Sequence, residues 1–238
     1  MENNTLFQKL NNILVQQFRN EEEILEIKKA FTMASDFHKG QYRRSEEAYI
    51  IHPLEVACIL AELQADKETI IAALLHDILE DTDAAPELIS DEFGPNVLNL
   101  VKGVTKLSKF SFSSKEERQA ENFRKMFLAM ANDVRVILLK LADRLHNMKT
   151  LHYMKPEKQK EISKETLEIF SPLANRLGMG KIKTELDDLA LNYLDPDKYL
   201  EIVKAVSQSR REREELVKTT IQTIEDILKT NEIEGEVQ

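Results

Sequence analysis

The sequence predicts an all-α protein, because apolar residues recur at helical spacing along nearly all of its 238 residues. Only six glycines and six prolines occur, and most lie where a run of helical periodicity begins or ends. No stretch alternates apolar and polar residues in the way that predicts a β-strand. Hydrophobic residues make up 42% of the chain and charged residues 32%, a balance that indicates a folded globular protein.

Helical periodicity and helix-breaking residues divide most of the chain into separate helices. Residues 53–63 and 70–78 each place apolar side chains on one helical face, and a proline opens the first segment. A Gly-Pro pair separates a helix at 86–93 from one at 95–107. A further proline begins a long helix that we expect to cover 156–172.

Two segments depart from this pattern. Residues 108–114, SKFSFSS, are rich in serine and predict a mobile loop. From Asp195 onward, apolar residues recur at helical spacing among many charges, which predicts one long amphipathic helix whose apolar face needs a partner. The chain ends soon afterwards, so we expect it to be a piece of a longer protein.

Composition also limits which kinds of binding partner and which cellular compartment we expect. The net charge of −9 argues against a dedicated nucleic-acid-binding protein, because phosphate backbones require clustered positive charge, although a local basic pocket stays open. The single cysteine, Cys58, excludes an internal disulfide and fits a reducing compartment. The first residues lack a signal-peptide pattern, and no apolar run is long enough to cross a bilayer. We therefore expect a cytoplasmic protein with no membrane or direct nucleic-acid partner.

The sharpest chemical signal is HDILED, which directly follows the apolar run IIAALL. If helical geometry continues, His76 and Glu80 share one face, and Asp77 and Asp81 occupy the neighbouring face. Four ionisable groups at the end of a buried helix are costly, and a metal would explain them, since imidazole and carboxylate ligands suit manganese, iron or zinc. The alternative interpretation is a solvated helix end with ordinary caps.

The second signal is KLADRLHNMKTL, which continues the apolar sequence VRVILL. Its apolar residues can face the core, whereas Lys140, Asp143, Asn147 and Thr150 align on another side at three- and four-residue intervals. Asp143 is a candidate metal ligand, and Asn147 and Thr150 are placed to hydrogen-bond a substrate. A surface polar face with a Lys140–Asp143 ion pair explains this motif alone equally well.

The third signal is GQYRRSEEAYIIHP, which joins basic residues to a histidine. The guanidinium groups of Arg43 and Arg44 can stack on a purine or donate paired hydrogen bonds to phosphate. Ser45 and Tyr49 follow them, and His52 stands just before a proline at a helix entrance. An isolated histidine is more often structural, so the interpretation of His52 as a ligand depends on the other two motifs.

Together the three motifs resemble the HD-domain pattern of a histidine, an adjacent His-Asp pair and a distant aspartate. More narrowly, segments that cover most of the chain resemble those of the RelA/SpoT family: GQYRRS, YIIHPLEVA, HDILEDT, VTKLSK, ENFRKM, KLADRLHNMKTL and SPLANRLGMGKIKTELDDLA. The intact HDILEDT is similar to SpoT-like bifunctional enzymes, because relatives restricted to synthesis lose this hydrolase motif.

The resemblance implies an HD-domain helical hydrolase that depends on manganese (Mn²⁺) and removes the 3′-pyrophosphate of ppGpp or pppGpp, leaving GDP or GTP. In bacteria this reaction ends the stringent response. It also implies an HD-type hydrolase domain at 1–155, a helical connector at 156–194 and, at 195–238, the first helix of a truncated synthetase domain. The rest of the synthetase domain and the regulatory region are then missing from this chain.

The resemblance further implies roles for individual residues. Matching positions assign the metal ligands to His52, His76, Asp77 and Asp143. The family's catalytic acidic pair corresponds to Glu80 and Asp81, which orient and deprotonate the attacking water or manage proton transfer. The substrate-binding positions correspond to Arg43, Arg44, Ser45, Tyr49, Asn147 and Thr150, with Lys140 and Arg144 as phosphate contacts.

Arg43 is the expected stacking partner for guanine. The family pattern SGEPY is replaced by SEEAY at 45–49, so a flexible glycine and a rigid proline are lost, which bears on loop geometry and substrate affinity. The remaining histidines, His38, His146 and His152, are interpreted as structural residues or as supports of the ligands.

Two other functions stay open at this point. An HD phosphohydrolase for another nucleotide would share the metal ligands and phosphate contacts, and the base pocket would discriminate it. A catalytically silent nucleotide-binding regulatory module would keep the same residues without turnover, and metal content with product analysis would discriminate that. A purely structural helical protein would leave the acidic and histidine positions of three motifs unexplained.

Overall fold

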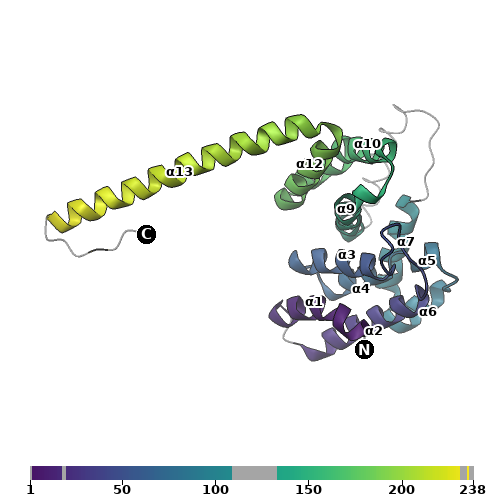
Figure 1. Cartoon of the computed structure of the whole chain (residues 1–238). Helices are drawn as coiled ribbons and strands as arrows, with labels where there is room; N and C mark the ends of the chain where they lie inside the picture. The colour runs from purple at the N-terminus through teal and green to yellow at the C-terminus, as the bar shows by residue number, and fades with distance from the viewer. Residues whose placement is uncertain (1, 18–19, 109–132, 231–234, 236–238) are drawn as a thin grey trace. The chain divides into compact units, whose positions relative to one another are not determined.

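The computed structural model describes residues 2–17, 20–108, 133–230 and 235, and it divides into two compact units that meet in sequence between Ala190 and Leu191 (Figure 1). Within the described ranges, the one β-type pairing is an isolated antiparallel bridge between Tyr42 and Ala48. The all-α prediction is therefore confirmed. No helix in these ranges is both long enough and apolar enough to span a bilayer.

The helices follow one another closely. In chain order they are α1 (Glu2–Gln17), α2 (Glu21–Phe37), α3 (Ile51–Glu62), α4 (Lys67–Leu75), α5 (Ile78–Asp81), α6 (Pro86–Phe93), α7 (Pro95–Ser108), α9 (Val134–Lys149), the 3-10 helix η1 (Leu151–Tyr153), α10 (Pro156–Glu165), the π-helix η2 (Thr166–Phe170), α11 (Ser171–Arg176), α12 (Gly180–Leu194) and α13 (Pro196–Thr230). The serine-rich loop predicted at 108–114 and the ENFRKM segment lie outside the described residues, apart from Ser108 at the end of α7.

The core of the first unit is built around α3 and α4. These helices pack on each other, α4 also packs on α2 and α7, and α3 packs on α1 and α9 (Figure 1). Leu60 of α3, Leu74 of α4 and Leu139 of α9 are completely shielded from solvent. Each such side chain stabilises the fold by about 1.5–3 kcal/mol. Because α3 carries His52, α9 carries Asp143, and the turn directly after α4 carries His76 and Asp77, this core fixes the backbone positions of the candidate metal ligands.

Charged caps join the starts of α4 and α9. The Asp66 carboxylate accepts the Thr69 N–H at 2.9 Å, and the Asp133 carboxylate accepts the Arg135 N–H at 2.9 Å. The Arg135 guanidinium also lies 2.9 Å from Glu68 and 3.4 Å from Asp66, so it crosses from one cap to the other. This contact helps to fix the register of α9 against α4.

The helix does not continue through HDILED as the sequence interpretation assumed. α4 ends at Leu75, a turn contains His76 and Asp77, and α5 begins at Ile78. The His76 Nδ1 lies 2.8 Å from the Ala73 carbonyl oxygen, which in an uninterrupted helix accepts the N–H of residue 77. The imidazole thus competes for a backbone acceptor where the helix ends.

The prediction that the helix beginning at Pro156 ends near Pro172 is wrong, since α10, η2 and α11 continue to Arg176. A proline inside a helix removes one N–H and crowds the preceding turn. Here the turn before Pro172 is a π-helix, in which the Ser171 N–H bonds the Thr166 carbonyl five residues back. This wider turn accommodates the proline.

The long helix predicted from Asp195 onward is present as α13. Many of its large apolar side chains are exposed, including those of Leu200, Val206 and Leu216. It belongs to the second unit, which begins within α12, and the candidate site belongs to the first.

The SEEAY loop closes into a tight turn despite the loss of the family's glycine. The Arg43 N–H bonds the Glu47 carbonyl at 2.9 Å, and the Tyr49 N–H bonds the Gln41 carbonyl at 3.0 Å. Glu46, at the position of the family's glycine, has a φ of 64°. This left-handed conformation costs an L-residue about 1–2 kcal/mol, so the turn is kept at the expense of backbone strain.

We expect Glu46→Gly to raise the free energy of unfolding by up to about 1 kcal/mol, because glycine removes the left-handed penalty but is more flexible when unfolded. Glu47→Gly is the matched control, because the backbone φ of Glu47 is not positive. Glycine at this position relieves no strain and only increases the conformational entropy of the unfolded chain, so it should lower the free energy of unfolding. Urea unfolding of both variants checks this. Equal destabilisation by the two changes would mean that the turn at Glu46 carries no strain.

Gly103 allows α7 to approach α9, because a Cβ at this position would lie 2.7 Å from the Val136 Cγ2. Gly103→Ala should lower the free energy of unfolding by about 1 kcal/mol or more, since overpacking against a stiff β-branched neighbour outweighs the helix propensity of alanine. Gly180→Ala at the start of α12 meets no atom within 4 Å and should be neutral or slightly stabilising. If urea unfolding gives both variants the same stability, the close approach has no energetic role.

Candidate active site

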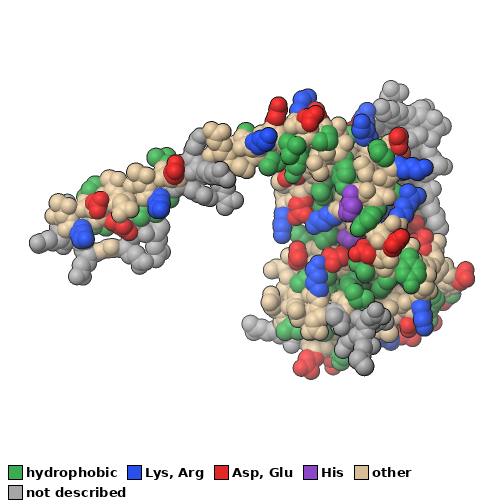
Figure 2. Space-filling view, viewed as in Figure 1, with side chains coloured by type: hydrophobic (Ala, Val, Ile, Leu, Met, Phe, Trp, Pro, Cys, Tyr) green, Lys and Arg blue, Asp and Glu red, His purple; other side chains and the backbone are tan. Residues whose placement is uncertain are grey.

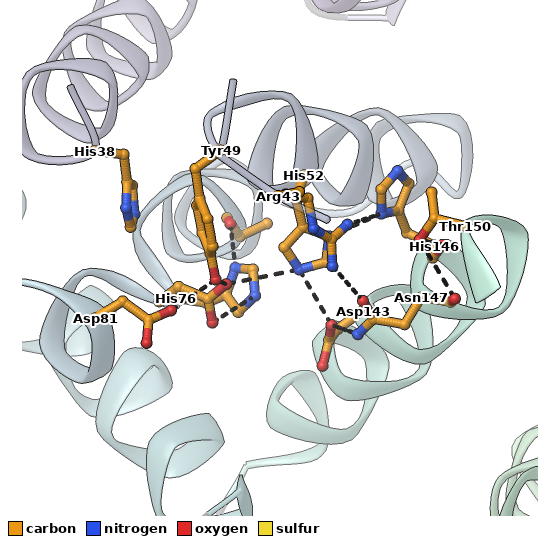
Figure 3. Close-up of polar contacts among 12 residues, drawn as sticks. His38, Arg43, Tyr49, His52, His76, Asp81, Asp143, His146, Asn147 and Thr150 are labelled. Carbon is orange, nitrogen blue, oxygen red and sulfur yellow. Dashed lines mark hydrogen bonds and ion pairs between the residues drawn. The ribbon is translucent and has the colours of Figure 1, made fainter. Parts of the chain in front are cut away.

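Three buried side chains from three helices bring possible metal ligands together. His52 lies in α3, His76 follows α4 directly, and Asp143 lies in α9. One ligand atom from each lies within 4.8 Å of the other two. The His52 Nε2 is 3.3 Å from the Asp143 Oδ1 (Figure 3). Residues more than 90 positions apart in sequence therefore meet at one point.

Asp77 lies beside this group and contacts both histidines. Its Oδ1 is 3.0 Å from the His76 Nε2, and its Oδ2 is 3.6 Å from the His52 Nε2. It does not belong to the set of atoms that all lie within 4.8 Å of one another. The four predicted metal ligands are thus neighbours, with Asp77 at the edge of the group formed by the other three.

The chemistry of His76 fits a metal ligand. Its Nδ1 donates to the Ala73 carbonyl, which can only accept, so the Nε2 of the neutral ring carries the lone pair. That Nε2 is buried, and although the Asp77 Oδ1 lies 3.0 Å away, no described residue makes a hydrogen bond of good geometry with it. A buried nitrogen without a hydrogen-bond partner is costly unless something binds it. Imidazole and carboxylate donors together suit a transition-metal ion, so the residues present fit such an ion.

Electrostatics keep the two aspartates ionised. Burial raises the pKa of Asp143, but Lys140, His52 and His76 outweigh burial and hold this pKa well below its ordinary range. Burial also opposes ionisation of Asp77, yet the two histidines lower its pKa as well. For His76, burial lowers the pKa, but Asp77 and Asp143 raise it above the ordinary value. A cation bound here would displace a proton from His76.

Asp143 also connects the ligand group to a polar network on α9. The Lys140 ammonium donates to its Oδ2 at 2.8 Å, and the Asn147 amide donates to its Oδ1 at 2.6 Å. The Asn147 Oδ1 in turn accepts from the Arg43 guanidinium at 2.7 Å. The Lys140–Asp143 ion pair of the alternative interpretation is therefore present, but Asp143 is only 5% exposed and is not part of a surface polar face.

A cavity of about 530 Å³ opens beside the ligand group. All eight residues that the sequence assigned to substrate binding line it, and so does Asp143. On the face turned to the viewer in Figure 2, basic and acidic side chains surround visible histidine atoms. The lining residues are Tyr42, Arg43, Arg44, Ser45, Tyr49, Lys140, Asp143, Arg144, Asn147, Thr150, Leu151, Tyr153, Met154, Ile162 and Glu165.

Some lining residues were not predicted from the sequence. Glu165 accepts from the Arg144 guanidinium at 2.7 Å, and the Phe170 ring lies 4.0 Å from the same group, so Arg144 is held from α10 and η2. Tyr42 and Tyr153 line the rim and are 69% and 48% exposed. Tyr42 lies inside GQYRRS and could have been named from that motif, whereas the α10 residues carry no local signal.

Tyr49 connects Asp77 and Asp81, two of the three acidic residues of HDILED. Its hydroxyl lies 2.9 Å from the Asp77 Oδ2. It also lies 2.6 Å from the Oδ2 of Asp81, which Figure 3 labels beside Tyr49. Burial and the two carboxylates raise the pKa of Tyr49, so the hydroxyl stays protonated and acts as a donor. Asp81 is exposed and Glu80 is partly buried, and neither lines the cavity.

The three remaining histidines lie outside the ligand group. His38 is buried and stacks on Tyr49 with ring centroids 4.5 Å apart. His146 is buried with its Nδ1 2.8 Å from the His52 Nδ1. His152 is exposed and packs on Tyr153.

Comparison with known proteins agrees with this geometry. The HD-domain family profile matches residues 30–180. The chain is 50% identical to the bifunctional (p)ppGpp synthase/hydrolase SpoT of Escherichia coli (strain K12) over 92% of this chain and 31% of that protein. It is 51% identical to a guanosine-3′,5′-bis(diphosphate) 3′-pyrophosphohydrolase of Aquifex aeolicus (strain VF5), over 90% of this chain and 30% of that protein.

A solved structure gives the same indication. It is that of a metazoan ortholog of SpoT that hydrolyzes ppGpp, with 28% identity and a TM-score of 0.53 over 69% of this chain and 93% of the other. The chain spans less than a third of the length of the two bacterial relatives. It belongs to the HD-domain family and, within it, to the SpoT-like members of the RelA/SpoT family.

Proposed function

We propose that this chain hydrolyses the 3′-pyrophosphate of ppGpp or pppGpp in a manganese-dependent reaction and thereby ends the stringent response. The single observation that carries the proposal is the position of Asp143, which belongs both to the ligand group and to the cavity wall. A nucleotide in that cavity would have its phosphates next to the ligand group. The names of the SpoT and pyrophosphohydrolase relatives support the choice of nucleotide.

The proposed ligands of manganese are His52, His76, Asp77 and Asp143. Their support is the buried Nε2 of His76 and the two ionised carboxylates beside it. A manganese ion, when bound, supplies positive charge against phosphate oxygens and acidifies water. The protein's own contribution is to hold imidazole nitrogens and carboxylates at one buried point before the ion arrives, which limits reorganisation on binding.

The cavity wall offers the groups that a guanine nucleotide needs. Arg43, Arg44, Lys140 and Arg144 supply positive charge for phosphates, and guanidinium groups can also donate paired hydrogen bonds or stack on a base. Ser45, Tyr49, Asn147 and Thr150 add shorter polar side chains for the ribose, the base and the phosphates. We assign the base to Arg43, in line with the family resemblance.

In the proposed reaction, a water molecule attacks the phosphorus bonded to the ribose O3′. The bond between that phosphorus and O3′ breaks, pyrophosphate departs, and O3′ takes up a proton to leave GDP or GTP. The acidic pair of Glu80 and Asp81 accepts one proton from the water and passes a proton to the leaving O3′. The Tyr49 hydroxyl, which donates to Asp81, orients this carboxylate.

The proposal also covers the organisation of the longer protein. We assign residues 1–155 to the hydrolase domain, 156–194 to a connector and 195–238 to the first helix of a synthetase domain. The division between compact units after Ala190 lies close to the proposed boundary at 194, and the 31% of the Escherichia coli relative that this chain covers is in line with further domains in a longer protein.

The direct test is product analysis with ppGpp and manganese. We expect stoichiometric GDP and pyrophosphate, loss of turnover after chelation, and recovery when manganese is returned. Binding without turnover at saturating manganese would instead favour a silent regulatory module. Faster turnover of another nucleotide in a parallel assay would favour a different HD phosphohydrolase.

Amide substitutions separate metal binding from chemistry. Glu80→Gln and Asp81→Asn should slow single-turnover hydrolysis by about 10²–10⁴-fold, because an amide cannot accept a proton, while manganese content and nucleotide affinity stay near wild type. Asp83→Asn, an exposed neighbour outside the site, is the control and should keep wild-type rates. Loss of manganese in the first two variants would move those residues into the coordination shell, and unchanged rates would make the pair structural.

A further inference from the structure

His146 belongs neither to the ligand group nor to the cavity wall, yet it lies between them. It is buried on α9, with 7% of its surface exposed. Its Nδ1 lies 2.8 Å from the His52 Nδ1 and 3.2 Å from the Arg43 Nη1. Figure 3 shows Arg43 in contact with both His146 and Asn147. The His146 Nδ1 therefore contacts both Arg43, which lines the cavity, and His52, which belongs to the ligand group.

The chemistry of these groups gives one consistent direction for both contacts, in which two donors share the single lone pair of the His146 Nδ1. A guanidinium group can only donate, so the His146 Nδ1 must be the acceptor and carries no proton. A nitrogen without a proton cannot donate to His52, so the His52 Nδ1 must carry the proton of that contact. The neutral His52 ring then has its lone pair on Nε2.

That lone pair is the one the ligand group requires. The His52 Nε2 is 3.3 Å from the Asp143 Oδ1 and 3.6 Å from the Asp77 Oδ2, whereas its Nδ1 faces His146. His76 reaches the same state by another route, because its Nδ1 donates to the Ala73 carbonyl. A backbone carbonyl is always an acceptor, but a histidine side chain accepts only if its own proton is elsewhere.

We propose that His146 is a positioning residue that fixes His52 in the tautomer with a free Nε2, and that Arg43 sets the state of His146. The proposal builds on the proposed function, because there Arg43 contacts the nucleotide and His52 holds the metal. Arg43 also donates to Asn147, which donates to Asp143. One guanidinium group in the nucleotide cavity thus orients two of the ligand residues.

The first test is spectroscopic and needs neither metal nor nucleotide. The chain has five histidines, so two-bond proton–nitrogen correlations of ¹⁵N-histidine-labelled protein can be assigned by single substitutions. In the metal-free wild type at mildly alkaline pH, His52 should carry its proton on Nδ1. A proton on the His52 Nε2 would overturn the proposal.

The second test uses Arg43 and its neighbour. Arg43→Met removes the obligatory donor, so both tautomers of His52 should become populated. Arg44→Met is the matched control, since the Arg44 guanidinium contacts Met154 and does not touch His146, and it should leave the His52 signals unchanged. A single Nδ1-protonated form in Arg43→Met would mean that Arg43 does not set the tautomer.

The third test measures manganese affinity by calorimetry. His146→Leu fills a similar volume but removes the nitrogen that accepts from His52. It should weaken manganese binding by about 10–100-fold, as the loss of a hydrogen bond to a metal ligand typically does. His146→Asn places an amide oxygen near the former Nδ1 and should restore affinity close to wild type. Wild-type affinity in His146→Leu, or equal weakening in a folded His146→Asn, would contradict the assigned role.

These measurements are separate from the test of hydrolysis. If the wild type binds manganese and shows the predicted His52 tautomer but leaves ppGpp intact, the proposed function fails and the role of His146 stands. If it hydrolyses ppGpp but His52 is protonated on Nε2, the role of His146 fails alone.

Discussion

The burial of the Asp143 carboxylate is the constraint on which the rest of the site depends. An ionised group inside a helical core is strongly unfavourable unless charges and hydrogen bonds compensate it. Here Lys140 donates to one of its oxygens and Asn147 donates to the other. The packing of α3 and α4 with α9 brings the candidate ligands together, so the apolar core and the polar site form one structure. A cation would complete the compensation.

The same network joins the proposed metal site to the cavity proposed for the nucleotide. Arg43 reaches the ligand residues along two paths, through Asn147 to Asp143 and through His146 to His52. A nucleotide that engages this guanidinium would therefore act on both ligands at once. Such coupling through shared hydrogen bonds is reciprocal, so metal binding would also prepare Arg43 for the nucleotide.

Spacing along the sequence predicted the helices well and, in large part, which side chains lie together at the candidate site, because core-facing periodicity and ionisable residues after apolar runs are local signals. All eight residues assigned to substrate binding line one cavity, and His52, His76 and Asp143 meet at one point. The contribution of Glu165 was not predictable, because it depends on how α10 folds back toward α9. The break at His76 and the continuation past Pro172 were also missed, since a side chain bonded to Ala73 and a π-turn override local propensity.

The most direct measurement of the central claim is anomalous X-ray scattering at the manganese absorption edge from crystals of this chain soaked in manganese. The account predicts one strong peak bounded by the Nε2 atoms of His52 and His76 and by the Asp143 carboxylate, with Asp77 beside it. A peak held by other residues, or none at this point under saturating manganese, would contradict the account.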